Sequence, residues 1–203
     1  MAAYSVGHSN LALEAFLDLL KIHQVDLVVD VRSNPYSQRN PQFNRPVLEG
    51  HLQNNSPDYL FFGDSLGGRP LDSKCYDSEG RVDYWKTRKT TGFLQGLQRF
   101  LDQAKTRNAV LMCAEEDPSQ CHRGLMIGPA MEEAGVDLIH IRRGGHLERV
   151  REFNNRVLAL SKILKIPQTP NLFPGKLESQ IQEDAFRVLA KKHAYIRSDN
   201  NQD

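Results

Sequence analysis

The sequence predicts an α/β fold of the Rossmann-like type, with a mostly parallel sheet flanked by helices. Apolar or β-branched runs alternate with amphipathic helical patterns through most of the chain, which is the order expected of βαβ units. The run at residues 25–31 is apolar without strict alternation, as in a strand that is buried on both faces. Reactive side chains follow several predicted strands, at the edge where such sheets bind ligands.

The N-terminal segments form the first βαβ unit. A strand at residues 4–6 precedes a helix whose apolar residues recur at helical spacing between residues 13 and 20. We expect Ser9 or Asn10 to cap this helix, because both side chains can accept a hydrogen bond from its first turn. The strand at 25–31 completes the unit.

A long loop is expected at residues 32–47, which contain three prolines and three arginines. Loops of this length inside compact domains are often functional. Arg39 and Arg45, together with Tyr36 and Phe43, supply the mixture of arginine and aromatic side chains that stacks on bases. The same side chains could instead pack the loop against the domain.

The remaining elements follow the same alternation. They are a short helix near residues 48–53, a strand at 59–62, a turn at 67–70, a helix at 91–105, a strand at 109–113, a helix at 122–134 with a kink at Pro129, and a strand at 136–141. We therefore place a Rossmann-like domain at residues 1–146. Residues 147–203 are expected to form two helices, 147–164 and 176–193, packed on the same domain. Periodicity leaves open whether they cover the site, extend a layer or form a homodimer interface.

Composition restricts the class of protein. The net charge of +1 argues against a protein that coats nucleic acid through bulk charge, although a local basic patch remains compatible with it. No apolar run approaches the length of about 20 residues that a spanning helix needs, so no membrane partner is expected. The N-terminus lacks the pattern of a signal peptide, and three cysteines are too few for a disulfide framework. We expect a cytoplasmic protein with reduced thiols.

Reactive residues from separate parts of the chain are expected to converge on one edge of the sheet. The segments are Gly7 to Asn10, Asp30 to Ser33, Cys113 to Glu116, Cys121 to Arg123, and His140 with Arg142 and Arg143. The third of these segments closes a strand and the fourth begins a helix, where backbone N–H groups favour anions.

These segments resemble the DUF488 family, a domain of unknown function. The resemblance is carried by GHSN at 7–10, DVRSNPYSQRNPQFN at 30–44, SLGGRP at 65–70, LMCAEEDPSQCHR at 111–123 and IHI at 139–141. It covers about residues 4–146, and the stretch from Cys113 to Arg123 is its most specific part. The resemblance implies a Rossmann-like α/β fold and a shared site, but no particular reaction. It implies nothing about residues beyond 146.

Two groups of candidate site residues follow. The catalytic candidates are Glu115, Asp30, His122, Cys113 and Cys121. The candidates for binding a substrate or a phosphate are His8, Ser9, Asn10, Arg32, Ser33, Arg69, Arg123 and His140. Glu115 stands out, because a carboxylate directly after a buried strand is costly unless it is solvated, paired or used in a reaction. For Asp30 and Arg32 the alternative is an ion pair that pins the long loop.

The cysteines have three interpretations. Cys113 or Cys121 is a nucleophile activated by His122 and the helix terminus; or the two thiols and His122 bind zinc or iron; or both cysteines are small packing residues. In the metal interpretation His8, His140 or His146 is a possible fourth ligand, although zinc sites usually contain more closely spaced cysteine pairs. The leading interpretation needs no cofactor.

The residues favour an enzyme, a hydrolase or a transferase, that acts on a phosphate-bearing, nucleotide-like or nucleic-acid substrate. Cleavage or transfer at an N-glycosidic bond is its most specific form, and phosphoester hydrolysis comes next. Two alternatives remain: a metal-binding or thiol-redox protein that uses Cys113, Cys121 and His122, and a non-enzymatic module that binds nucleic acid or another ligand.

Overall fold

The computed structural model describes residues 2–55, 57–162 and 174–197. Its strands are β1 (Ala2–Gly7), β2 (Leu27–Asp30), β3 (Asp58–Phe61), β4 (Ala109–Cys113), β5 (Asp137–Ile141) and β6 (Leu147–Glu148). Its α-helices are α1 (Leu13–Ile22), α2 (Arg45–Asn55), α3 (Tyr84–Thr87), α4 (Thr91–Ala104), α5 (Gly128–Glu133), α6 (Val150–Ser161) and α7 (Pro174–His193). Short 3₁₀ turns are η1 (Pro41–Phe43), η2 (Ser73–Cys75) and η3 (Pro118–Gln120), and η4 (Arg123–Ile127) is a π-helix.

One six-stranded sheet runs through the molecule in the order β3-β2-β4-β1-β5-β6. The first five strands in this order are parallel, and β6 pairs with β5 in the antiparallel direction. This confirms the predicted α/β class. Because β4 lies between β1 and β2, Gly7 pairs with Cys113 and Asp30 pairs with Met112. The ends of three strands therefore lie side by side.

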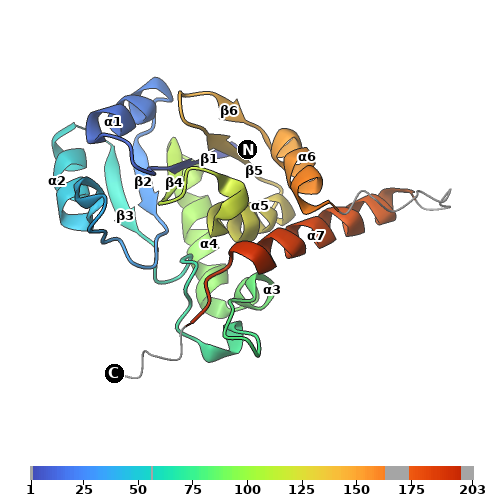
Figure 1. Ribbon diagram of the computed structural model, residues 1–203. Coiled ribbons are helices and arrows are strands. Elements are labelled where there is room, and N and C mark those ends of the chain that lie inside the picture. The colour runs from blue at the N-terminus through green and yellow to red at the C-terminus, as the bar shows by residue number, and fades with distance from the viewer. Residues whose placement is uncertain (1, 56, 163–173, 198–203) are drawn as a thin grey trace.

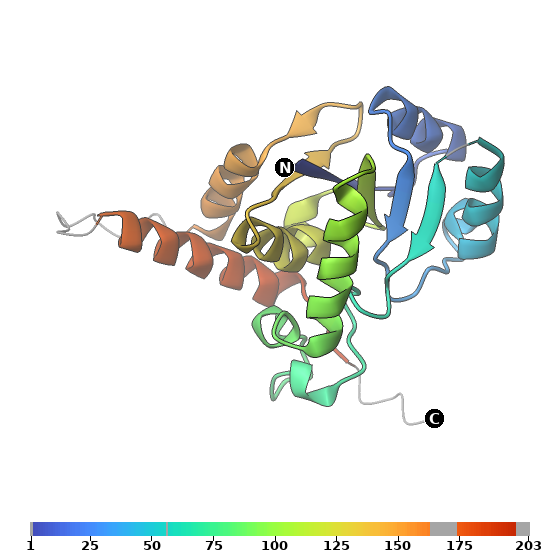
Figure 2. The same ribbon diagram turned by 180° about the vertical axis from the view of Figure 1, so that it is seen from behind.

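Helices cover both faces of the sheet (Figures 1 and 2). On one face, side chains from α1, α2 and η1 pack on alternate residues of β1, β2 and β4 such as Val6, Val28 and Met112. On the other face, α4, η4, α5, α6 and α7 pack on the remaining residues, which include Val29 and Leu111. Both faces of the central strands are thus buried, which explains why their sequences do not alternate strictly.

The C-terminal helices belong to this second layer. Phe153 on α6 and Phe186 on α7 lie in the same buried cluster as strand residues Leu111 and Leu138, and α7 also projects past the body at its N-terminal end (Figure 1). The predicted helix at 147–164 was wrong at its start, because Leu147 and Glu148 pair with β5 before α6 begins. The connection expected between the two helices, residues 165–175, lies outside the described residues up to 173, and Pro174 already begins α7.

Three local predictions are corrected. Neither Ser9 nor Asn10 caps α1, which begins after Ala12 without a side-chain cap. The loop at 32–47 is shorter than predicted, because η1 forms within it and α2 already begins at Arg45. The helix at 122–134 is not one kinked α-helix.

The segment 122–134 consists of the π-helix η4 followed by α5, and Pro129 lies in the first turn of α5. η4 and α5 are continuous, and the π-helical turn before Pro129, in which Gly128 N donates to Arg123 O, is the departure from a regular α-helix.

Within the described residues, the structure has no helix of the length and apolar character that would be needed to cross a membrane.

Candidate active site

The loop after β4 is held by the backbone that follows β1. His8 N donates to Cys113 O at 3.0 Å, and Ser9 N donates to Ala114 O at 2.8 Å. Gly7 permits this approach, since a Cβ at this position would lie 1.7 Å from Glu115 O. Only glycine allows the two chains to come so close.

Arg123 fixes the same loop from the other side. Its side chain is fully buried, and its two terminal nitrogens donate to Glu115 O at 2.5 Å and to Glu116 O at 2.6 Å. Its Nε has no hydrogen-bond partner in the structure. Among the described residues no carboxylate forms an ion pair with it. The guanidinium therefore acts as a clamp on backbone carbonyls.

Two further arginines bind the carboxylates of this loop. Arg142 donates to both carboxylate oxygens of Glu116 at 2.9 Å, and Arg156 donates to Asp117 at 2.9 Å. Glu148 on β6 joins them, because it accepts at 2.6 Å from each arginine. Contacts with Arg142 and Arg143 keep the pKa of Glu116 below its usual value. The loop that carries Glu115 is thus fixed before any ligand binds, which is the condition for an efficient site.

A cavity of about 230 Å³ lies beside this loop. It is lined by Arg32, Ser33, Asn34, Gly68, Arg69, Tyr84, Cys113, Ala114, Glu115, Gln120, Cys121, His122, His193 and Tyr195. The structure therefore brings together four of the five catalytic candidates, and Arg32, Ser33 and Arg69 from the binding candidates. The cavity lies at the carboxyl edge of the parallel strands, as predicted.

Two thiols, an imidazole and a carboxyl group lie in contact in the cavity wall. Cys113 Sγ donates to Glu115 Oε2 at 3.0 Å. His122 Nδ1 lies 3.7 Å from Cys113 Sγ and 3.8 Å from Cys121 Sγ, and its Nε2 donates to Val31 O at 3.0 Å. All three cysteines of the chain are free thiols, as expected. This arrangement can provide a nucleophile, a proton carrier or a set of metal ligands.

The protonation of this cluster is set by burial and by neighbouring charges. Burial raises the pKa of Glu115 and, together with Cys121, raises the pKa of the Cys113 thiol well above its usual value. Burial also opposes ionisation of Cys121, but the hydrogen bond from Cys113 and the charges of Arg123 and His122 hold its thiol pKa well below the usual value. The proton of the thiol pair is therefore kept on Cys113, and Cys121 is the sulfur that ionises.

Asp30 lies beneath the cavity. It is fully buried, binds Arg32 through contacts of 2.6 to 3.2 Å, and accepts from Tyr59 Oη at 2.7 Å. The ion pair that the sequence offered as the alternative is therefore present, and the second terminal nitrogen of Arg32 contacts His8 Nε2 at 3.1 Å. Arg32 also donates to Phe43 O at 2.9 Å, which ties the predicted loop to β2. Asp30 thus orients Arg32, which lines the cavity.

His8 is a buried, neutral histidine. Burial and the nearby charge of Arg32 lower its pKa to about 4. Its Nδ1 donates to Ser9 O at 2.8 Å, so that Nε2 is free to accept from Arg32. Its ring stacks on Phe43 at 4.2 Å between centroids. His8 therefore helps to hold the Arg32 guanidinium in place by accepting its hydrogen bond.

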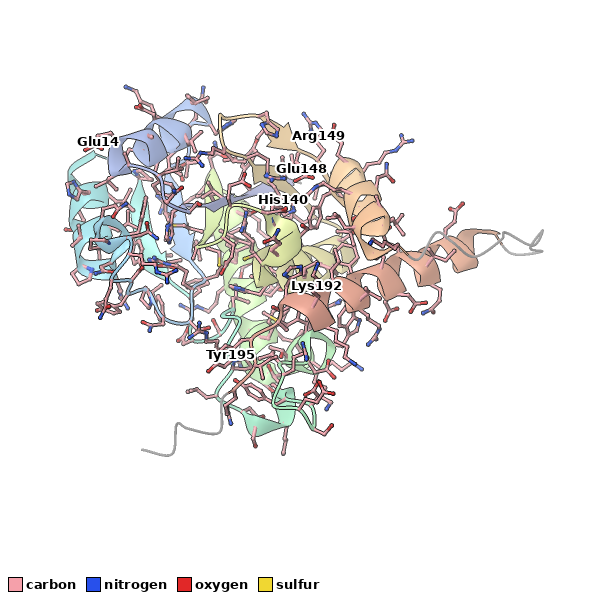
Figure 3. The ribbon with its side chains drawn as sticks, viewed as in Figure 1. Glu14, His140, Glu148, Arg149, Lys192 and Tyr195 are labelled. Carbon is pink, nitrogen blue, oxygen red and sulfur yellow. The ribbon has the colours of Figure 1, made fainter. Side chains whose placement is uncertain are left out.

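Several predicted site residues do not line the cavity. Ser9 contributes its backbone and Asn10 is exposed, while Arg123 holds the loop. His140 is buried among the strands, where it bonds Ser5 Oγ at 2.6 Å and packs its ring against Phe153 (Figure 3). Among the described residues, the donors near enough to one another to hold a metal ion are Cys113, Cys121 and His122, and none of the three proposed fourth histidines joins them.

The aromatic part of the predicted stacking surface also lies elsewhere. Phe43 is fully buried, and Tyr36 is exposed outside the cavity. Arg45 lies over the rings of Tyr59 and Phe61, at 5.9 and 4.7 Å from their centroids. Phe43 and Arg45 therefore pack the segment against the domain, the alternative that the sequence left open, whereas Tyr36 and Arg39 are exposed.

Three cavity residues were missed because nothing near them in the sequence indicates a site. Tyr84 begins α3, His193 ends α7, and Tyr195 follows α7 (Figure 3). A backbone hydrogen bond from Val82 N to Tyr195 O at 2.9 Å joins the segment after α7 to the residues just before α3. Tyr195 also lies under the guanidinium of Arg69, 4.4 Å from it. The C-terminal segment therefore completes the cavity wall.

Comparison with known proteins identifies a family but no function. The family model described as "Domain of unknown function DUF488" matches residues 12–128, which is more than half of the chain. This span contains the strands β2, β3 and β4 and the stretch from Cys113 to Arg123. No curated protein and no solved structure matched the sequence.

Proposed function

The chain belongs to the DUF488 family, whose description names no reaction, so we propose from the site itself that the protein is a hydrolytic enzyme that uses Glu115 as its acid/base. The observation that carries the proposal is the position of the Glu115 carboxyl group. It lies in the wall of a cavity, on a loop that arginines hold from beneath. A proton carrier in such a fixed position typically contributes a rate factor of about 10² to 10⁴.

The charges of the cavity favour an anionic substrate. Arg32 and Arg69 line it, while Glu115 is the carboxylate among its lining residues. Arg32 lines the cavity, but each of its guanidinium nitrogens already contacts Asp30, Phe43 O or His8 Nε2, whereas Arg69 is exposed at the rim. A phosphate near these guanidinium groups would gain charge-assisted hydrogen bonds.

The size of the cavity limits the part of the substrate that enters. Sites for small molecules usually enclose about 300 to 1,000 Å³, and this cavity has about 230 Å³. It suits one base or one sugar, with the rest of the molecule at the rim beside Arg69 and Tyr195. A nucleotide, or a nucleotide unit of a nucleic acid, has this shape.

Cleavage of an N-glycosidic bond fits these features best. In this reaction the bond between the sugar carbon and the base nitrogen breaks, and the oxygen of water forms the new bond to the sugar carbon. Glu115 takes the proton from the water and returns it to the leaving base. The reaction needs no oxidant or second substrate.

The test is the release of free base from a panel of nucleosides, nucleotides and single-stranded nucleic acids. We expect the wild type to release base from at least one of these classes, and Glu115→Gln to be slower by about 10² or more. Glu14→Gln is the matched control, because Glu14 is an exposed glutamate on α1 (Figure 3). An active Glu115→Gln variant, or a wild type that releases base from none of the panel, would refute the proposal.

A thiol-dependent reaction is the second candidate, because Cys121 is the thiol favoured to ionise and its sulfur lies 3.8 Å from His122 Nδ1. Rapid alkylation of Cys121 with loss of turnover, in a metal-free sample, would support this candidate. Turnover that survives full alkylation would exclude it.

A further inference from the structure

We propose that Cys113, Cys121 and His122 bind one zinc ion whose fourth ligand position faces the cavity. The binding site stands on the geometry of these three residues. Only its part in the reaction, the supply of the attacking water, rests on the proposed hydrolytic function.

The three donor atoms are spaced as ligands of one ion. The two sulfurs and the His122 Nδ1 all lie within 4.8 Å of one another, and the nitrogen lies 3.7 and 3.8 Å from the sulfurs. With zinc–sulfur and zinc–nitrogen bonds of about 2.3 and 2.1 Å, a tetrahedral ion separates sulfur from nitrogen by about 3.6 Å and two sulfurs by about 3.8 Å. Both sulfur–nitrogen distances are therefore within about 0.2 Å of this geometry. The two sulfurs, which lie within 4.8 Å of each other, have to approach by no more than about 1 Å.

A backbone hydrogen bond orients the imidazole of His122. His122 Nε2 lies 3.0 Å from Val31 O, and a carbonyl oxygen only accepts, so the ring proton is on Nε2. Nδ1 is then the nitrogen that faces the two sulfurs, and it can bind a metal ion once its own proton is lost. A histidine that binds a metal is commonly fixed in this way, by a hydrogen bond from its other nitrogen to a backbone carbonyl.

The surroundings hold the ligands in place. Gly68 packs against the His122 ring, where a Cβ would lie 2.9 Å from Nδ1. The backbone N–H of Arg123 donates to Cys121 Sγ at 3.4 Å, a contact that favours a thiolate ligand. Residues outside the ligand set therefore contact two of the three ligands, His122 and Cys121.

The charges of the cluster are compatible with a metal site. Arg123 is a fully buried cation whose hydrogen bonds go to backbone carbonyls, and such a charge is costly without a compensating anion. A zinc dication and two thiolates cancel, so metal binding adds no net positive charge beside Arg123, and an ionised Glu115 balances the guanidinium.

Three protein ligands and an open fourth position are typical of catalytic zinc. All three ligands line the cavity, and so does Glu115, whose Oε2 contacts Cys113 Sγ. A water molecule at the fourth position would give its proton to Glu115 and attack as hydroxide. Zinc enzymes that act on nucleobases combine the same ligand types with a glutamate that is not a ligand. Two sulfurs and one imidazole favour zinc over magnesium or calcium.

The test is the metal content of the full-length protein, produced with zinc in the medium and purified without a histidine tag. We expect one zinc per chain in the wild type and loss of zinc in Cys121→Ser and His122→Gln. Cys75→Ser is the matched control, since Cys75 is also a buried free thiol but lies outside the cluster. It is expected to retain the metal.

A second measurement uses only the wild type, in case the variants fail to fold. Removal of zinc with a chelator and titration with Co²⁺ should produce a thiolate-to-cobalt absorption band and the visible bands of tetrahedral cobalt. A wild type with no more zinc than Cys121→Ser and no thiolate–cobalt band would overturn the proposal. So would a Cys113–Cys121 disulfide in protein purified under reducing conditions.

The two proposals fail in different ways. Zinc bound without release of base from any substrate would refute the glycosidic function and leave the metal site standing. Base release that depends on Glu115 in a protein without zinc would do the reverse.

Discussion

Replacement of Arg123 by methionine separates two roles for this residue. The sequence predicts a phosphate ligand, whereas in the structure both terminal nitrogens of Arg123 bind the carbonyls of Glu115 and Glu116. Methionine fills most of the same space but donates no hydrogen bond. The Arg123→Met variant therefore removes the clamp while it preserves most of the packing.

The expected loss follows from the contacts. Each buried carbonyl that loses its donor costs about 1 to 3 kcal/mol. Removal of a buried cation returns part of this free energy. We expect Arg123→Met to lower the free energy of unfolding by about 2 to 4 kcal/mol.

Urea denaturation followed by far-ultraviolet circular dichroism measures this quantity. Arg69→Met is the control, because Arg69 is exposed at the rim of the cavity and its loss should change stability by less than about 1 kcal/mol. If Arg123→Met had the stability of the wild type but bound phosphate-bearing ligands more weakly, the clamp would be refuted and the predicted phosphate role restored.

Three other perturbations test the support of the site. Gly7→Ala places a Cβ 1.7 Å from a carbonyl oxygen of the loop after β4 and should lower the free energy of unfolding by about 3 kcal/mol or more. The control Gly50→Ala has open space at its Cβ and should not lower the melting temperature. Equal melting temperatures for the two variants would contradict the close approach. Tyr59→Phe removes the 2.7 Å hydrogen bond to Asp30 and should lower the unfolding free energy by about 1 to 3 kcal/mol in urea; an unchanged midpoint would show that the bond contributes nothing. Burial, followed by nearby arginines, holds the pKa of His140 well below 6.5, so below that pH the unfolded chain binds a proton that the folded chain does not, and stability should fall by about 1.4 kcal/mol per pH unit. Urea titrations between pH 6.5 and 5 should show a shallower fall for His140→Gln, and parallel curves for the two proteins would rule this contribution out.

The prediction of the fold rested on local patterns that survive in the structure. The predicted strand at 109–113 is β4 without change, and β2 lies inside the predicted strand at 25–31. Both are buried on two faces, so their apolar runs indicate a central position. The start of α6 was missed because the two residues of β6 are too short to produce a periodic pattern.

The prediction of the site was uneven for a similar reason. Cys113, Glu115, Cys121 and His122 lie within one short stretch at a strand end, so their convergence follows from local sequence alone. The direction in which an arginine side chain points does not follow from local sequence. Arg123 turns inward because unpaired carbonyls of the neighbouring loop need donors, and no pattern near Arg123 shows this.

By itself, therefore, the sequence determined the α/β class, the strands that end at the site and the reactive cluster from Cys113 to His122. Only the tertiary structure decided that Asp30 supports Arg32 from below, that Arg123 is a clamp, and that Tyr195 closes a cavity. The physical reason is the range of the interactions involved. Burial patterns and strand ends are local properties of the chain, whereas a hydrogen-bond partner or a cavity wall depends on segments that only folding brings together.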